Sequence, residues 1–105
     1  MVSVGRLPNV EDLGLETLGI EQTPGGHIVA DDTRTNIPNI YAVGDLTADI
    51  ALVNVGELEG RHAVEKIMGV ANGTLVYENI SQIMFLVPEA AGVGMNEIQA
   101  QQKGM

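Results

Sequence analysis

The residues with the clearest potential for chemistry are Gly44 and Asp45, which follow the apolar run at residues 40–43. That run is β-prone and bounded by turn residues, so it predicts a buried strand. In open α/β sheets, ligands lie beyond the carboxyl ends of the strands, and Asp45 occupies that position. An ionised carboxylate only accepts hydrogen bonds, which suits a hydroxyl of a sugar-like chain, and Gly44 lets a ligand approach the backbone. The alternative is that Asp45 is an ordinary turn carboxylate or a helix cap.

A helix is expected soon after this motif, because apolar residues recur at near-helical spacing over residues 52–68. Its first turn would present free N–H groups and a partial positive charge, which stabilise anionic groups nearby. Thr47 or Asp49 is the expected N-terminal cap. The pattern therefore predicts a ligand-facing helix end close to Asp45.

The remaining pattern predicts a mixed α/β fold. Further strands are expected at residues 28–30 and 83–87, and a capping box at residues 96–99 predicts the start of another helix. Gly56 and Gly60 fall inside the long helix. Each costs about 1 kcal/mol relative to alanine unless another backbone must approach closely.

The sequence indicates no catalytic residue and no metal ligand. It contains no cysteine, which excludes a disulfide, a thiolate nucleophile and a Cys-ligated zinc site within this chain. His27 and His62 fall in no metal-ligand spacing. We expect His27 and Arg6 to be exposed in turns, and His62 to be solvated or packed without an acid–base partner.

The composition indicates an acidic globular protein. Hydrophobic residues make up 45% and charged residues 18%, and 5 basic against 14 acidic residues give a formal charge of −9. Such a surface repels nucleic acid phosphates and anionic membranes, so neither is an expected partner. The longest apolar stretches are too short to span a bilayer. These features predict a cytoplasmic protein.

Several stretches, in order along the chain, resemble the pyridine nucleotide–disulfide oxidoreductase family of flavoproteins, which includes dihydrolipoamide dehydrogenase, glutathione reductase and mercuric reductase. The stretch with Gly44 and Asp45 resembles that family's second flavin-contacting motif. The full set of similar stretches is residues 4–9, 18–20, 28–31, 35–45, 59–61 and 87–94. The resemblance covers essentially the whole chain and about a quarter of a typical family member.

The resemblance implies specific roles. Asp45 would bind a ribitol hydroxyl of FAD, Gly44 would let the cofactor lie against the strand end, and the backbone near Leu52 and Val53 would face the flavin's pyrimidine edge. It also implies a fragment of a Rossmann-like FAD-binding domain plus the start of an α+β dimer-interface domain. Residues 1–9 would end the NAD-binding domain, 10–76 would belong to the FAD-binding domain, and 77–105 would open the interface domain. NAD(P)H would be a co-substrate, and self-association as a homodimer or larger species is expected.

The chain departs from the family's pattern in ways that affect activity. It has no Gly-x-Gly-x-x-Gly segment to hold the FAD pyrophosphate and no redox cysteine pair. We therefore expect this chain to be an inactive fragment of an FAD-dependent NAD(P)H:disulfide oxidoreductase that binds FAD weakly, if at all. The alternative is a non-catalytic α/β binding or oligomerisation module of the same ancestry.

Overall fold

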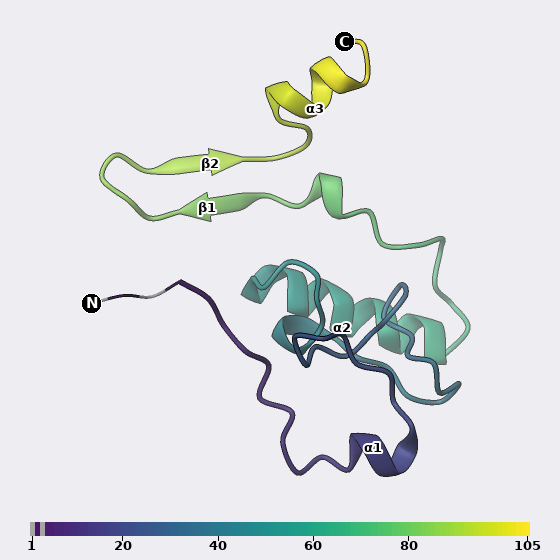
Figure 1. Ribbon diagram of the computed structural model, residues 1–105. Helices are drawn as coiled ribbons and strands as arrows, with labels where there is room; N and C mark the ends of the chain where they lie inside the picture. The colour runs from purple at the N-terminus through teal and green to yellow at the C-terminus, as the bar shows by residue number, and fades with distance from the viewer. Residues whose placement is uncertain (1, 3) are drawn as a thin grey trace. The chain divides into compact units, whose positions relative to one another are not determined.

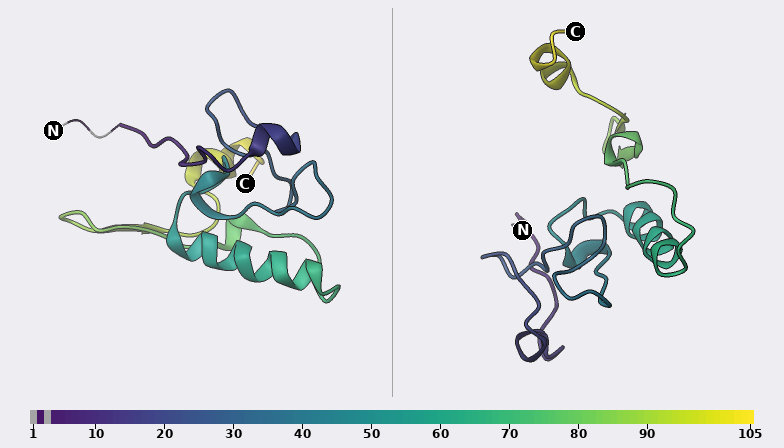
Figure 2. Two further views of the ribbon diagram at one scale, coloured as in Figure 1. Left: turned by 90° about the horizontal axis from the view of Figure 1, so that it is seen from below. Right: turned by 90° about the vertical axis from the view of Figure 1, so that its right-hand side faces the viewer.

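The computed structural model describes residue 2 and residues 4–105, which divide into two compact units at residues 74 and 75. The first unit contains the short helix α1 (Leu15–Leu18), the 3-10 helix η1 (Gly44–Leu46) and the long helix α2 (Val53–Ile67) (Figure 1). Two further views show α2 lying beside the loops of this unit (Figure 2). The prediction of one long helix over residues 52–68 is confirmed.

The strands predicted at residues 28–30 and 40–43 were wrong. Neither segment forms a β-strand. Each makes only isolated β-bridges, in which Ile28 pairs with Gln22 and Thr47, and Tyr41 pairs with Arg34. A β-prone sequence forms a ladder only where neighbouring strands supply several successive partners. In the described part of the first unit, turns separate the bridging residues and end each pairing after one bridge.

A small apolar cluster holds these loops together. Leu15, Ile20, Ile28 and Ala42 are buried and pack with partly buried neighbours. Those neighbours are Val10, Ala30, Ile37, Ile40 and Leu46. The cluster thus connects α1 to the extended segment that leads into η1, and it anchors the segment that carries Gly44 and Asp45.

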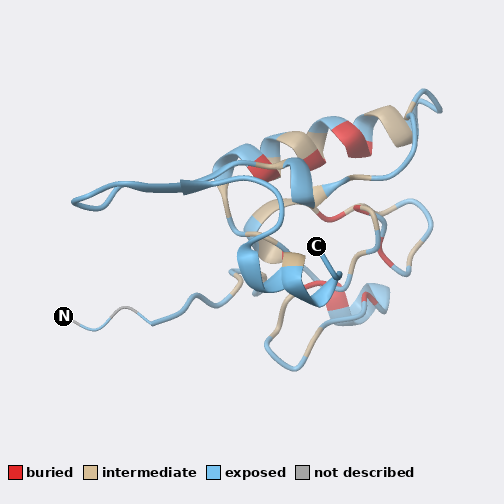
Figure 3. Cartoon of the chain, turned by 90° about the horizontal axis from the view of Figure 1, so that it is seen from above, coloured by how far each residue is buried: buried red, intermediate tan, exposed pale blue. Residues whose placement is uncertain are grey.

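The buried face of α2 is half polar. Val55, Glu59, His62 and Ala63 are its buried residues, and their spacing places them on one side of the helix (Figure 3). The apolar residues near the C-terminal end of the helix that helped to predict it, among them Val64 and Ile67, are more than half exposed. The apolar pattern therefore identified the helix but not the face that it buries.

A charged cluster joins α2 to the turn at residues 31–34. Lys66 Nζ donates to Asp32 Oδ2 and, at 3.0 Å, to the Asp32 carbonyl, while His62 Nε2 lies 2.9 Å from Asp32 Oδ1 without hydrogen-bond geometry. Asp32 and Thr33 both have positive φ, 47° and 71°, a region that costs non-glycine residues of order 1–3 kcal/mol. The bonds from Lys66 help to hold the turn in this strained conformation.

The second unit contains a hairpin and a helix. After the 3-10 helix η2 (Tyr77–Asn79), strand β1 (Gln82–Met84) pairs antiparallel with β2 (Ala90–Gly92), with Ile83 opposite Ala91. The strand predicted at residues 83–87 thus ends early, because the chain turns after Met84 to reach β2, which the sequence did not predict. Helix α3 (Glu97–Gln102) begins with the predicted capping box between Asn96 and Gln99.

The structure is a mixture of helices and a small two-stranded sheet. The coarse prediction of a mixed fold is therefore confirmed. In the described residues, no helix has both the length and the apolar character that crossing a membrane requires.

We predict that Lys66→Ala lowers the free energy of unfolding by about 1–3 kcal/mol, because it removes the hydrogen bonds to a mostly buried carboxylate. Urea denaturation followed by circular dichroism measures this change. Arg61→Ala is the matched control, since it removes a cation from the same helix but from an exposed pair with Glu65 at 3.9 Å. Equal effects of the two substitutions would contradict the role of the Asp32 cluster.

Candidate functional site

Gly44 is the residue about which the candidate site is built. Its φ of +77° lies in the left-handed region, which glycine adopts without strain. Val43 before it is extended, with φ −142° and ψ 152°, so the chain changes direction sharply at Gly44. The Gly44 carbonyl accepts from the Thr47 N–H at 3.0 Å and from Thr47 Oγ1 at 2.9 Å. These bonds close η1 and fix the position of Asp45 within it.

A buried carboxylate from α2 holds the other side of Gly44. Glu59 is 1% exposed, and its Oε2 accepts a hydrogen bond from the Gly44 N–H at 2.6 Å. Such charge-assisted bonds are shorter and stronger than those between neutral groups. The bond joins η1 to the middle of α2, fifteen residues further along the chain.

Two glycines let the helix come close enough for this bond. A Cβ atom on Gly56 would lie 3.3 Å from the Gly44 Cα, a distance that requires a neighbour to move. A close backbone approach that would explain a glycine inside the helix is therefore present at Gly56. At Gly60 no such approach is found in the described residues, because a Cβ atom there would meet nothing within 4 Å.

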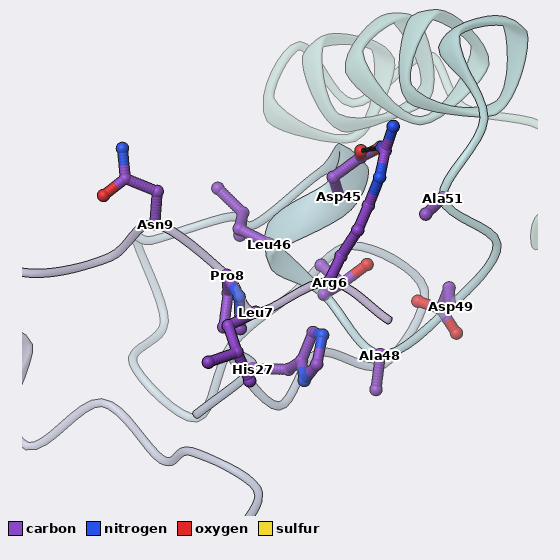
Figure 4. A pocket seen from close by; sticks show the side chains of 11 residues that line it. Arg6, Leu7, Pro8, Asn9, His27, Asp45, Leu46, Ala48, Asp49 and Ala51 are labelled. Carbon is purple, nitrogen blue, oxygen red and sulfur yellow. Dashed lines mark hydrogen bonds and ion pairs between the residues drawn. The ribbon is translucent and has the colours of Figure 1, made fainter. Parts of the chain in front are cut away.

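Asp45 lies at the wall of an open pocket of about 580 Å³. Arg6 Nη1 donates to Asp45 Oδ2 at 2.6 Å, and the two side chains point toward one another in Figure 4. Both side chains are largely exposed, at 77% and 52%, so this pair contributes little to stability in water. The pocket's lining in the described residues is Arg6, Leu7, Pro8, Asn9, His27, Asp45, Leu46, Thr47, Ala48, Asp49 and Ala51.

The four predicted cofactor-binding residues fall into two places. Asp45 lines the pocket and Gly44 lies next to it, in contact with α2. Leu52 and Val53 begin α2 one and two residues beyond Ala51, which also lines the pocket, although neither lines it itself. Leu52 is the N-cap and makes no side-chain cap bond, so the prediction of Thr47 or Asp49 as the cap was wrong. Thr47 is used instead to close η1.

The two histidines lie in different surroundings. His27 is half-buried and lines the pocket, whereas we expected it to be exposed. His62 is buried, which was one of the two outcomes that we expected. We expected no acid–base partner for it, but its ring lies against the carboxylate of Asp32. Across residue 2 and residues 4–105, no three His, Asp or Glu side chains are grouped as a metal site would require.

Glu59 is the site residue whose role sequence reasoning missed. The sequence did carry a signal for it, because Glu59 lies four residues after Val55 and so on the same helical face. A carboxylate on a buried face needs a donor, and the Gly44 N–H is such a donor. The sequence could not show which donor it would meet.

Comparison with known proteins identifies a family and several relatives that this chain resembles. Residues 1–69 match the family described as pyridine nucleotide-disulphide oxidoreductase. The chain is 42% identical to dihydrolipoyl dehydrogenase from Bacillus subtilis over 106 residues, covering 100% of this chain and 22% of that protein. It is 43% identical to dihydrolipoyl dehydrogenase from Corynebacterium glutamicum over 105 residues, covering 98% of this chain and 22% of the relative.

Two solved structures are similar to this chain over nearly its whole length, but the chain covers only a small part of each. LpdA from Mycobacterium tuberculosis superposes with a TM-score of 0.89 at 30% identity, covering 98% of this chain and 23% of that one. The HOCl-induced flavoprotein disulfide reductase RclA from Escherichia coli superposes with a TM-score of 0.80 at 28% identity, covering 97% and 24%. The chain thus spans less than a quarter of the length of these relatives.

We predict that Gly56→Ala is less stable than Gly60→Ala by about 1–3 kcal/mol, because only the first pushes a Cβ atom against Gly44. Both variants gain the same helix propensity, about 1 kcal/mol, so their difference isolates the close contact. Thermal unfolding of both, beside the wild type, measures it. Equal melting temperatures for the two variants would show that α2 does not approach Gly44 as closely as the structure has it.

Proposed function

Because this chain belongs to the pyridine nucleotide-disulphide oxidoreductase family, we propose that it is the part of an FAD-dependent oxidoreductase that holds the ribitol chain of the flavin. The observation that carries the proposal is the position of Asp45, a carboxylate at the edge of an open pocket next to a glycine turn. FAD would supply the hydride and electron chemistry, and this chain's own residues would bind and orient it.

The residues present fit such a ligand. Arg6 bonds to Oδ2 of Asp45, and an ionised carboxylate has a second oxygen that can accept from a ribitol hydroxyl. Gly44 keeps side-chain atoms away from the turn, and the backbone at Leu52 and Val53 begins the helix next to the pocket. The positive end of that helix would stabilise negative charge on a reduced flavin.

The thiol chemistry of disulfide reduction would come from residues outside this chain. Disulfide exchange requires a thiolate, and the 105 residues contain no cysteine. We propose NAD(P)H as the co-substrate of the complete enzyme, and a binding role for this portion. We also propose that residues 1–9 end the NAD-binding domain, residues 10–76 belong to the FAD-binding domain and residues 77–105 open the interface domain. The division of the chain at residues 74 and 75 lies close to the second of these boundaries.

We predict that the chain binds FAD more weakly than micromolar. A charge-assisted hydrogen bond contributes about 1.5–3 kcal/mol, whereas micromolar affinity needs about 8 kcal/mol. Asp45→Ala should weaken the remaining affinity by roughly 10-fold or more, as measured by titration of flavin fluorescence.

The matched control is Asp49→Ala, which removes the same charge from the same pocket without touching η1. If both substitutions weaken FAD binding equally, Asp45 acts only through its charge and the proposed hydroxyl contact is wrong. Submicromolar binding by the wild-type chain would also refute the account, since the contacts named here are too few for it.

The exposed apolar side chains of the second unit support a second role, oligomerisation, in addition to flavin binding. Five consecutive apolar side chains are half-exposed or more in and after β1. These are Ile83, Met84, Phe85, Leu86 and Val87. No charged residue lies between Glu78 and Glu89, so two copies of this acidic chain could meet here without direct repulsion. We therefore propose self-association through this hairpin.

We predict a dimer or larger species in solution, and partial dissociation on Phe85→Ser. Phe85 is 81% exposed, so its replacement removes apolar contact area without opening a core. Multi-angle light scattering across a concentration series measures the mass. Val70→Ser, an exposed apolar residue of the first unit, is the control. A wild-type monomer at high concentration would exclude this role for the hairpin.

A further inference from the structure

Glu59 is a carboxylate in a place where carboxylates are uncommon. With Val55 it is one of the two largest fully buried side chains in the described residues. Burying an ionised carboxylate is unfavourable unless hydrogen bonds replace its water. Its bond from the Gly44 N–H, at 2.6 Å, is one such replacement. The partner is a main-chain group of the turn that presents Asp45, which suggests a role beyond helix packing.

The bonds on the two sides of Gly44 leave its peptide groups little freedom. Glu59 holds the N–H from α2, and Thr47 holds the carbonyl from within η1. Gly56 limits how far the Cα atom can move toward the helix. Because Asp45 follows directly, its Cα position relative to the start of α2 depends on this arrangement.

We propose that Glu59 is a positioning residue for flavin binding, which acts by holding Gly44 so that the Asp45 carboxylate faces the pocket. The inference rests on the proposed function, in which Asp45 receives a ribitol hydroxyl. It adds a residue that does not line the pocket in the described residues. Loss of Glu59 should leave Asp45 present but free to turn away.

The role is not interchangeable with that of other acids on α2. Glu57 is exposed on the same helix and Glu65 pairs with Arg61 at 3.9 Å, so neither reaches η1. Removal of Glu57 changes the net charge by the same amount as removal of Glu59. A comparison of the two variants therefore separates the bond to Gly44 from the effect of charge.

The test is nuclear magnetic resonance of the isotopically labelled 105-residue chain, as wild type, Glu59→Ala and Glu57→Ala, with and without millimolar FAD. Amide exchange at Gly44 should be about 10- to 100-fold faster in Glu59→Ala, the factor that loss of a charge-assisted hydrogen bond gives. FAD should shift the Asp45 amide resonance in wild type and Glu57→Ala and shift it much less in Glu59→Ala. A purely structural role would leave the FAD-induced shift unchanged at equal saturation.

Glu59→Gln provides a second measurement should the alanine variant unfold. The amide has nearly the same shape and can still accept from the Gly44 N–H, but without charge. The Gly44 amide proton should move upfield relative to wild type, and the FAD-induced shift at Asp45 should be largely retained. A Gly44 amide proton that does not respond to Glu59→Gln overturns the proposed bond.

The outcomes separate the two proposals. If wild type responds to FAD at Asp45 and Glu59→Ala responds equally, the positioning role is wrong and the flavin site stands. If the wild-type chain shows no response at Asp45 to FAD, the proposed function is wrong, and the positioning role toward flavin is wrong with it.

Discussion

The close approach of α2 to the backbone of Gly44 is the constraint on which the candidate site depends. Gly56 allows the approach because it has no Cβ atom, which would lie 3.3 Å from the Gly44 Cα. At this short separation Glu59 Oε2 accepts a hydrogen bond from the Gly44 N–H at 2.6 Å. The left-handed φ of Gly44 is the third requirement, since it turns the chain from the extended Val43 into η1. Asp45 reaches the pocket only as a consequence of this arrangement, so the chemistry of the site depends on residues that do not line it.

Directional hydrogen bonds join helix α2 to two turns of the first unit. Glu59 accepts a hydrogen bond from the backbone of η1, and Lys66 donates hydrogen bonds to Asp32 in the strained turn at residues 31–34. Polar contacts of this kind require particular atoms to meet, so they fix the rotation and register of a helix more narrowly than an apolar stripe does. A broad apolar face could slide against its neighbours. The hydrogen bond from Gly44 to Glu59 thus helps to keep Gly56 opposite Gly44.

The two units contribute differently to the proposed function. The first contains the pocket, Asp45 and the helix end, and its small apolar cluster includes Leu46 of η1 itself. The second unit has no fully buried residue among the described residues 75–105, and it exposes most of the apolar side chains of its hairpin. A two-stranded hairpin is at best marginally stable by itself. The exposed apolar side chains of the hairpin are therefore consistent with a surface that becomes covered when chains associate. The pocket of the first unit is consistent with ligand binding.

The sequence by itself determined the elements whose signal is local. The spacing of apolar residues predicted α2, the Asn96–Gln99 capping box predicted α3, and the Gly44–Asp45 pair after an apolar run marked the turn at the pocket. Only the tertiary structure decided what depends on distant partners. The segments at residues 28–30 and 40–43 have strand-like sequences, but they lack the successive neighbours that form a ladder. The buried face of α2 is set by Gly44 and Asp32, so Glu59 and His62 lie inside while Val64 and Ile67 remain exposed. Hydrophobic periodicity reports the apolar side of a helix, whereas burial follows from where close approach and hydrogen-bond partners are available.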